Sequence, residues 1–242
     1  MNIDFIGTGT MGCLDRINTS ILIDDEILFD ICSGTVNKLR TLNKDLTKIK
    51  YIFISHYHAD HFLDIAFFLL RRYIRTKNEK SLTIIGPRDI RNKVIELMYF
   101  THGDNKPNKY DDIENKFNLK FIEMIDSEEA IDNFSVKSVT LKHGTCEPCN
   151  GYILTKDNNT IGYTGDTTLC EGLNTLIESS NYIFIDVTMQ DTNDAHVGYT
   201  SMVDIANDNK DKKFYAVHRG DFDININTNN IEYPNDGDKV QL

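Results

Sequence analysis

A dense group of potential metal ligands occupies six consecutive positions, His56-Tyr57-His58-Ala59-Asp60-His61. Two imidazoles two residues apart can reach one metal ion from a single backbone segment, and the carboxylate and third imidazole just beyond can turn toward a second ion. The group directly follows the apolar run 51–54, which is typical of a buried strand. These side chains are therefore expected in a strand-end loop that is rigid but open to water. The pattern predicts a two-metal hydrolytic site.

Three further candidate ligands lie where other predicted strands end. His143 follows the run 136–142, and His218 follows the run 214–217. Asp166 comes after a strand predicted at 160–164, and Gly165 before it permits a tight turn that can direct the carboxylate between two ions. Each of the three could be structural when taken alone. Together with the first group they complete a set of ligands that fits a binuclear site.

Length and charge limit the partners that the protein can have. The chain has 242 residues, of which 40% are hydrophobic, and no linker rich in Pro, Gly or Ser divides it, so a single domain spanning 1–242 is expected. The formal net charge of -11 disfavours an extended RNA or DNA footprint, because nucleic-acid binders usually carry a basic stripe. A small anionic substrate stays compatible, since two divalent ions would dominate the field of their own pocket.

The chain carries no obvious targeting signal. Its first residues do not combine a basic segment with an apolar stretch, and the longest apolar run, 65–70, is too short to cross a bilayer. Five cysteines make an odd count without a disulfide framework, as expected in a reducing compartment. A cytoplasmic protein without membrane contact is predicted.

Periodicity and turn signals predict an α/β fold. The polar segment 101–116 is expected to be an irregular connector. Strands are predicted near 2–6, 20–24, 26–31, 51–54, 82–85, 117–123, 134–142, 151–155, 160–164, 181–186 and 213–217, and helices near 34–43, 61–76, 87–100, 171–179 and 200–208. Two successive blocks of strands, each with helices attached, imply two sheets packed face to face with helices outside. This is a four-layer αββα sandwich.

Taken together, the motifs resemble those of the metallo-β-lactamase superfamily, in its ribonuclease Z-like branch with the compact cyclic phosphodiesterases. The resemblance covers nearly the whole chain. It rests on Phe5-Ile6-Gly7-Thr8-Gly9-Thr10, Leu28-Phe29-Asp30, Ser33-Gly34-Thr35, the group 56–61, Gly86-Pro87, His143, Gly165-Asp166-Thr167, His196, His218, and Tyr233-Pro234 with Asp236-Gly237.

The resemblance implies a role for each ligand. His56, His58 and His143 would bind one metal ion, Asp60, His61 and His218 would bind the other, and Asp166 would bridge them. The ions would be two divalent metals, with Zn²⁺ expected first and Mn²⁺ or Fe as alternatives. Asp30 resembles the buried aspartate that supports the ligand loop, although it could also be a simple strand-end acid.

The resemblance also implies a phosphodiesterase mechanism, in which a metal-bridging hydroxide attacks phosphorus and Asp60 orients it. His196 would protonate the leaving oxygen, yet its motif is one residue longer before Thr200 than in the family, and a structural helix-start histidine is the alternative. Backbone amides of Ser33-Gly34-Thr35 would line the phosphate pocket, unless they form an ordinary helix cap.

The substrate expected from this branch is small. Relatives that process tRNA carry a long arm between the positions matching His143 and Asp166, where this chain has 22 residues. A small or cyclic phosphodiester or a short nucleotide is therefore predicted. The alternatives are an endonuclease like ribonuclease Z that lacks the usual arm, a lactone or thioester hydrolase using Tyr163 or Tyr199, and a nucleotide-binding module without activity.

Three features stay outside this scheme. Cys146-Glu147-Pro148-Cys149 follows His143 and is interpreted as a rim loop, with a reversible disulfide or a structural metal as alternatives. His102 is expected to be an exposed loop histidine. The sequence does not determine the oligomeric state. Relatives commonly pair as homodimers, and the helix around Phe67 and Phe68 would either form such an interface or, as the favoured interpretation has it, pack within the protomer's own core.

Overall fold

The computed structural model describes residues 1–102, 109–222, 224 and 228–242, and two seven-stranded sheets lie at its centre. The first sheet has the order β14 (Lys239–Gln241), β1 (Asn2–Gly7), β2 (Ser20–Ile23), β3 (Ile27–Phe29), β4 (Tyr51–Phe53), β5 (Leu82–Gly86) and β6 (Leu119–Glu123). The second has the order β13 (Ile231–Glu232), β12 (Lys213–Val217), β11 (Tyr182–Asp186), β10 (Asn159–Tyr163), β9 (Asn150–Lys156), β8 (Phe134–Thr140) and β7 (Glu128–Ile131).

Each sheet contains a parallel block, and these blocks position the site. Strands β3 to β6 are parallel to one another in the first sheet, and β10 to β13 are parallel to one another in the second. Parallel strands bring their carboxyl ends to one edge of a sheet, where open α/β sheets commonly bind ligands. The segments that leave β3, β4, β10 and β12 hold most of the predicted site residues.

Aromatic side chains fill the space between the two sheets. Phe29 packs on Phe53 and Tyr163 with ring centroids 4.9 Å apart, and Phe184 stacks on Tyr215 at 5.2 Å. These rings belong to one buried cluster to which both sheets contribute. Burying such a side chain stabilises the fold by about 1.5–3 kcal/mol. A common core therefore holds the two sheets face to face, with aromatic side chains from β1, β3, β4, β9, β10, β11 and β12.

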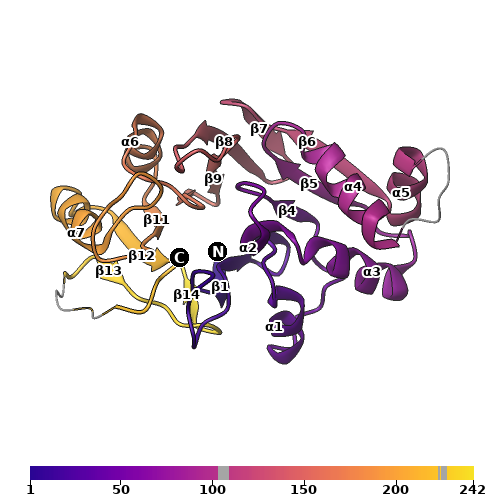
Figure 1. The fold of residues 1–242 in the computed structure, drawn as a ribbon, viewed down its shortest axis with the longest axis horizontal. Helices are drawn as coiled ribbons and strands as arrows, with labels where there is room; N and C mark the ends of the chain where they lie inside the picture. The colour runs from indigo at the N-terminus through magenta and orange to yellow at the C-terminus, as the bar shows by residue number, and fades with distance from the viewer. Residues whose placement is uncertain (103–108, 223, 225–227) are drawn as a thin grey trace.

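Helices cover the outer face of each sheet. The helices on the first sheet share a second core cluster with that sheet. They are α1 (Thr35–Thr41), α2 (Ala59–Phe62), α3 (Ile65–Thr76), α4 (Ile90–His102) and α5 (Lys109–Phe117). Those on the second sheet are α6 (Glu171–Glu178) and α7 (Tyr199–Asp208). Figure 1 shows α3, α4 and α5 grouped at one end of the molecule and α6 and α7 at the other. The predicted four-layer αββα fold is confirmed.

The structure differs from the prediction in several elements. The expected connector 101–116 is wrong, because α4 runs to His102 and α5 occupies 109–117, while 103–108 lie outside the described residues. The polar composition of α5 concealed Ile113 and Phe117, which lie one turn apart and are both buried in the core of the first sheet. The helix predicted at 61–76 is divided at Leu63 and Asp64 into α2 and α3.

The break between α2 and α3 has a local cause. The Asp64 amide donates to the Ile31 carbonyl at 3.2 Å, and its carboxylate accepts a hydrogen bond from the Val36 amide at 2.9 Å. These contacts attach the chain to the segment that leaves β3. The short strands β7 and β13 were not predicted, since one is rich in exposed acids and the other has only two residues. Among the described helices, none has the length and apolar character needed to cross a bilayer.

Candidate metal centre

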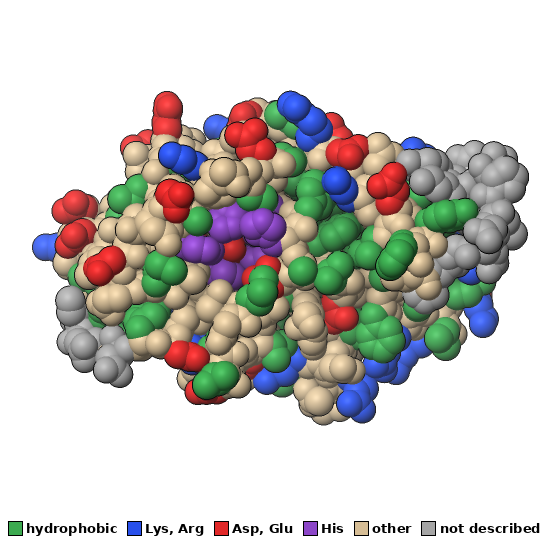
Figure 2. Space-filling view, in the orientation of Figure 1, with side chains coloured by type: hydrophobic (Ala, Val, Ile, Leu, Met, Phe, Trp, Pro, Cys, Tyr) green, Lys and Arg blue, Asp and Glu red, His purple; other side chains and the backbone are tan. Residues whose placement is uncertain are grey.

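The predicted ligands converge in two clusters at the carboxyl ends of the parallel strands. Figure 2 shows the histidines gathered in a hollow on one face of the molecule, with acidic side chains among them. The first ligand cluster contains His56, His58, His143 and Asp166. The second ligand cluster contains Asp60, His61, Asp166 and His218. Within each cluster, one ligand atom from every residue lies within 4.8 Å of the others.

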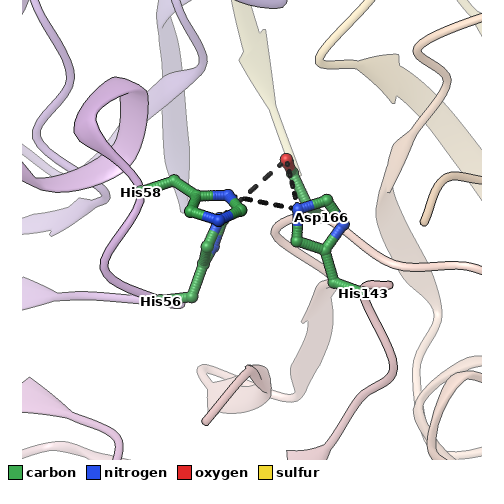
Figure 3. Close-up of side chains that lie close together, drawn as sticks. All are labelled: His56, His58, His143 and Asp166. Carbon is green, nitrogen blue, oxygen red and sulfur yellow. Dashed lines mark hydrogen bonds and ion pairs between the residues drawn. The ribbon is translucent and has the colours of Figure 1, made fainter. Parts of the chain in front are cut away.

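Distances in the first cluster suit a shared cation (Figure 3). The His143 Nε2 atom lies 3.2 Å from His58 Nδ1 and 3.7 Å from Asp166 Oδ2, and His56 Nε2 lies 4.0 Å from the same oxygen. Nitrogen ligands about 2.0–2.1 Å from a tetrahedral zinc ion lie about 3.3–3.4 Å from one another. The side chains are thus close to the spacing that one metal ion requires.

The second cluster uses the other oxygen of the same aspartate. Asp166 Oδ1 lies 3.1 Å from His61 Nε2 and 3.3 Å from His218 Nε2. Asp60 Oδ2 lies 3.5 Å from His218 Nε2 and 3.7 Å from His61 Nε2. Asp166 therefore presents one carboxylate oxygen to each cluster, the arrangement needed in a bridging ligand.

Some polar atoms of the predicted ligands lack a hydrogen-bond partner, as metal-binding atoms commonly do. His56 Nε2 and Asp60 Oδ1 are buried without a hydrogen-bond partner. An unsatisfied buried polar atom costs about 1–3 kcal/mol, and a metal ion bound to these two atoms would remove that cost. Burial alone would raise the pKa of Asp166, but the neighbouring His218 and His61 lower it far below its ordinary value, so the carboxylate is ionised. Imidazoles and carboxylates in this number fit divalent metal ions.

The backbone conformations at Gly165 and His218 orient two of the ligands. Gly165 has a φ of 56°, and a Cβ atom at this position would lie 2.5 Å from the Ser55 Cβ atom, so only glycine allows the turn that directs Asp166. His218 has a φ of 50° and is held by its amide, which donates to Thr19 Oγ1 at 2.8 Å. The turns after β10 and β12 thus bring ligands from the second sheet toward the 56–61 loop of the first.

Asp30 supports the ligand loop through four hydrogen bonds. It is fully buried and accepts bonds from the Ser55 amide, the Ser55 hydroxyl and His61 Nδ1, each at 2.7 Å, and from the Tyr163 hydroxyl at 2.6 Å. Ser55 Oγ also lies 3.0 Å from His56 Nδ1. Asp30 thereby contacts a ligand of the second cluster directly and a ligand of the first through one hydroxyl. This contact pattern matches its predicted supporting role, which itself stays a prediction.

His196 lies at the edge of both clusters. Its ring centroid is 4.8 Å from that of His143 and 5.7 Å from that of His218, on which it stacks. Its Nδ1 atom lies 2.8 Å from Asp186 Oδ2. Burial alone would lower the pKa of His196, but the hydrogen bond and charge of Asp186 raise it above 6.5. The geometry suits a proton donor beside the metal ligands, although that role stays a prediction.

Asp186 is a site residue that the sequence analysis missed. It is fully buried and belongs to a third group of potential ligands, with Asp166, His196 and His218. The signal that could have revealed it is its place as the acid that ends the apolar strand β11. His143 and His218 had been identified from the same placement after an apolar run.

Other predicted site residues fit their expected roles less well. The Thr35 amide already donates to the Cys32 carbonyl at 3.0 Å, and α1 has only seven residues, so the phosphate role of Ser33, Gly34 and Thr35 stays a prediction without structural support. Tyr163 and Tyr199 are both buried, with Tyr163 bonded to Asp30, and neither is placed to contact a substrate.

The two cysteines that follow His143 belong to neither ligand cluster. Cys146 and Cys149 are free thiols, and the Cys149 thiol donates to the Cys146 carbonyl at 3.3 Å. The side chain of His102 lies outside the described residues. Phe68 is buried and Phe67 is 45% exposed, so the alternative of a dimer face on this helix stays untested.

Comparisons with known proteins identify the family of the chain. Residues 1–233 match the family described as "Anti-Pycsar protein Apyc1". The ribonuclease Z of Staphylococcus carnosus is 29% identical over 160 residues, a match that covers 63% of this chain and 48% of that protein. The chain thus spans less than half the length of this curated relative.

Solved structures share the fold. The short form of human tRNase Z superposes with a TM-score of 0.76 at 18% identity, covering 100% of this chain and 99% of that chain. A diphosphatase of the PhnP family gives a TM-score of 0.74 at 16% identity, covering 100% and 97%. The chain therefore belongs to the Anti-Pycsar protein Apyc1 family, within the ribonuclease Z-like branch of the metallo-β-lactamase superfamily.

Proposed function

We propose that the protein is a phosphodiesterase that uses two divalent metal ions, Zn²⁺ in the first instance, to hydrolyse a small or cyclic phosphodiester. The observation that carries the proposal is His196 beside the two ligand clusters, held by the buried Asp186 at 2.8 Å. Departure of an alkoxide from phosphorus requires a proton, and a positioned acid typically contributes about 10²- to 10⁴-fold to the rate. The site thus combines metal ligands with a proton donor.

Each group has a defined task in this reaction. The seven ligands would hold the two ions, which when bound lower the pKa of coordinated water from 15.7 toward about 7 and stabilise charge on the phosphorus oxygens. Asp60 Oδ1, buried and without a hydrogen-bond partner, can accept a bond from the attacking water and orient it. Asp186 holds the Nδ1 side of His196, so that Nε2 delivers the proton to the leaving oxygen.

The compact segment between His143 and Asp166 supports a small substrate. It contains only a short loop and the hairpin of β9 and β10, whose strands pair within the second sheet. No arm extends from it to grip a folded RNA. The formal charge of -11 adds long-range repulsion of a polyanion, and this repulsion matters least for a small ligand inside a metal pocket.

A ribonuclease Z-like endonuclease is the second candidate. The 29% identity to a ribonuclease Z over 160 residues favours it, while the compact segment argues against it. The lactone or thioester hydrolase has weaker support, because the two tyrosines that could have contacted a carbonyl are buried. A binding module without activity is also disfavoured, since every predicted ligand is present and converges.

Metal analysis followed by a substrate panel tests the proposal. The panel contains bis-p-nitrophenyl phosphate, 2′,3′-cyclic and 3′,5′-cyclic nucleotides, a lactone and a pre-tRNA. We expect turnover of bis-p-nitrophenyl phosphate and of at least one cyclic nucleotide, and no turnover by an Asp166→Asn control. Preferred cleavage of the pre-tRNA would favour the endonuclease, and turnover of the lactone alone would refute phosphodiester chemistry.

A further inference from the structure

The Thr188 hydroxyl lies at the centre of a hydrogen-bond network that joins the two sides of the site. Thr188 follows β11 by two residues, next to the turn that carries His218. Its Oγ1 atom lies 2.7 Å from Asp186 Oδ1, 2.7 Å from His218 Nδ1 and 3.1 Å from His196 Nδ1. One side chain thus contacts a predicted metal ligand, the candidate proton donor and the carboxylate between them.

Counting donors and acceptors assigns a direction to each bond. A threonine hydroxyl has one hydrogen to donate and two lone pairs to accept with. The Asp186 carboxylate oxygens accept, so Thr188 donates to Oδ1 at 2.7 Å, and the nitrogens of His218 and His196 donate to Thr188. The His218 carbonyl, at 3.3 Å, is a longer and weaker acceptor for the same hydroxyl hydrogen. The His196 hydrogen is shared with Asp186 Oδ2, at 2.8 Å. The one hydrogen and both lone pairs of the hydroxyl are therefore used.

This assignment places a hydrogen on the Nδ1 atom of both histidines. With its hydrogen on Nδ1, His218 presents the lone pair of Nε2 toward Asp166 Oδ1 at 3.3 Å and Asp60 Oδ2 at 3.5 Å. That is the orientation a metal ligand requires, and such outer contacts typically affect metal affinity about 10- to 100-fold. His196 is likewise left with Nε2 free to carry the transferred proton.

We propose that Thr188 is a positioning residue that sets the tautomer of His218 for metal binding and, with Asp186, connects the second ligand cluster to His196. The inference rests on the proposed function for the role of His196, but the metal-binding half does not need a substrate. Its physical basis is that one hydroxyl accepts from two imidazoles while it donates to the carboxylate between them. An aliphatic side chain of equal size can do neither.

Zinc titration of the metal-free protein tests the metal-binding half. Thr188→Val removes the hydroxyl at nearly constant shape, Thr188→Ser retains it, and Thr155→Val on β9 serves as a matched remote control. We expect the wild type and Thr155→Val to bind two equivalents. Thr188→Val should bind the first normally and the second about 10- to 100-fold more weakly. Thr188→Ser should restore binding to within a few-fold of the wild type. Thermal unfolding of each metal-free variant verifies that it is folded.

Turnover at saturating zinc tests the connection to His196. Thr188→Val should lower kcat more for a cyclic nucleotide than for bis-p-nitrophenyl phosphate, because only the former has a poor leaving group, and KM should change less.

The outcomes separate the two proposals. Wild-type affinity for the second equivalent in Thr188→Val, or equal weakening in Thr188→Ser, would overturn the role of Thr188, as would a wild-type protein that binds a single equivalent. If the wild type binds two equivalents with the expected pattern among the variants but cleaves no phosphodiester, the proposed function fails and the role of Thr188 in metal binding stands.

Discussion

The buried Asp30 carboxylate holds the ligand loop through four hydrogen bonds, and Asp30→Asn tests this support with a minimal change. Asparagine keeps the shape and also tolerates the left-handed backbone found here, with a φ of 51°. The asparagine amide can be placed in two ways that exchange its oxygen and its NH₂ group. The more favourable one puts the oxygen at the position of Oδ2, where it keeps the contacts with His61, Tyr163 and the Ser55 hydroxyl. Its NH₂ group would then face the Ser55 amide, which donates to Oδ1 in the wild type at 2.7 Å.

The expected loss of stability follows from these contacts. Hydrogen bonds to a charged group contribute about 1.5–3 kcal/mol and neutral ones about 0.5–1.5 kcal/mol, and an unsatisfied buried donor costs about 1–3 kcal/mol. Three weakened bonds and one unsatisfied donor together therefore cost about 4–7 kcal/mol. His61 would also lose the carboxylate that orients its ring. We expect zinc affinity at the second ligand cluster to fall about 10- to 100-fold.

Two measurements check these values. Urea unfolding of the metal-free protein gives the change in stability, and zinc titration with a competing chelator gives the affinity of each equivalent. Asp64→Asn is a matched control, because Asp64 accepts a hydrogen bond from the Val36 amide at 2.9 Å and belongs to neither ligand cluster. The control should lose about 1 kcal/mol of stability and bind zinc normally.

Two results would contradict this reasoning. One is an Asp30→Asn protein that binds both equivalents with wild-type affinity, since His61 would then not depend on the carboxylate. The other is an equal loss of affinity in Asp64→Asn, which would attribute the effect to general destabilisation of this part of the fold.

Three further predictions concern the bridging ligand, the proton donor and a remote ion pair. Asp166→Asn should reduce bound zinc from two equivalents to about one, because an amide offers a single oxygen, and metal analysis of the folded variant checks this. His196→Ala should lower kcat about 10²- to 10⁴-fold for an alkoxide leaving group and far less for p-nitrophenolate, and equal losses would exclude the proton-donor role. Burial alone would raise the pKa of Asp24, but the Asn2 amide and Lys156 lower it below 3.8. The pair therefore stabilises the fold above that pH and loses its effect as pH falls through the folded pKa. Lys156→Met should cost less than about 1 kcal/mol in urea unfolding at pH 7, and this cost should shrink as pH falls below 3.8. A cost independent of pH would point to packing instead.

Local patterns accounted for the ligands and for the fold class. His56, His58, Asp60 and His61 could be identified because four potential ligands stand in one short segment after a strand. Asp166 and His218 could be added because a polar residue after an apolar run lies at a strand end. These are properties of neighbouring residues, and the alternation of strands and helices that predicts the αββα sandwich is equally local.

Tertiary structure decided which partners these residues have. Thr188 with His218, Asp30 with Tyr163, and the two oxygens of Asp166 with separate clusters all join segments that are distant in sequence. Helix α5 was missed for the same reason, since Ile113 and Phe117 stabilise it only by packing on the first sheet. The spacing of apolar residues along a chain indicates which face of a helix or strand is apolar. The hydrogen-bond partner of a buried polar group depends instead on which strand ends meet, and that is settled only when the two sheets pack together.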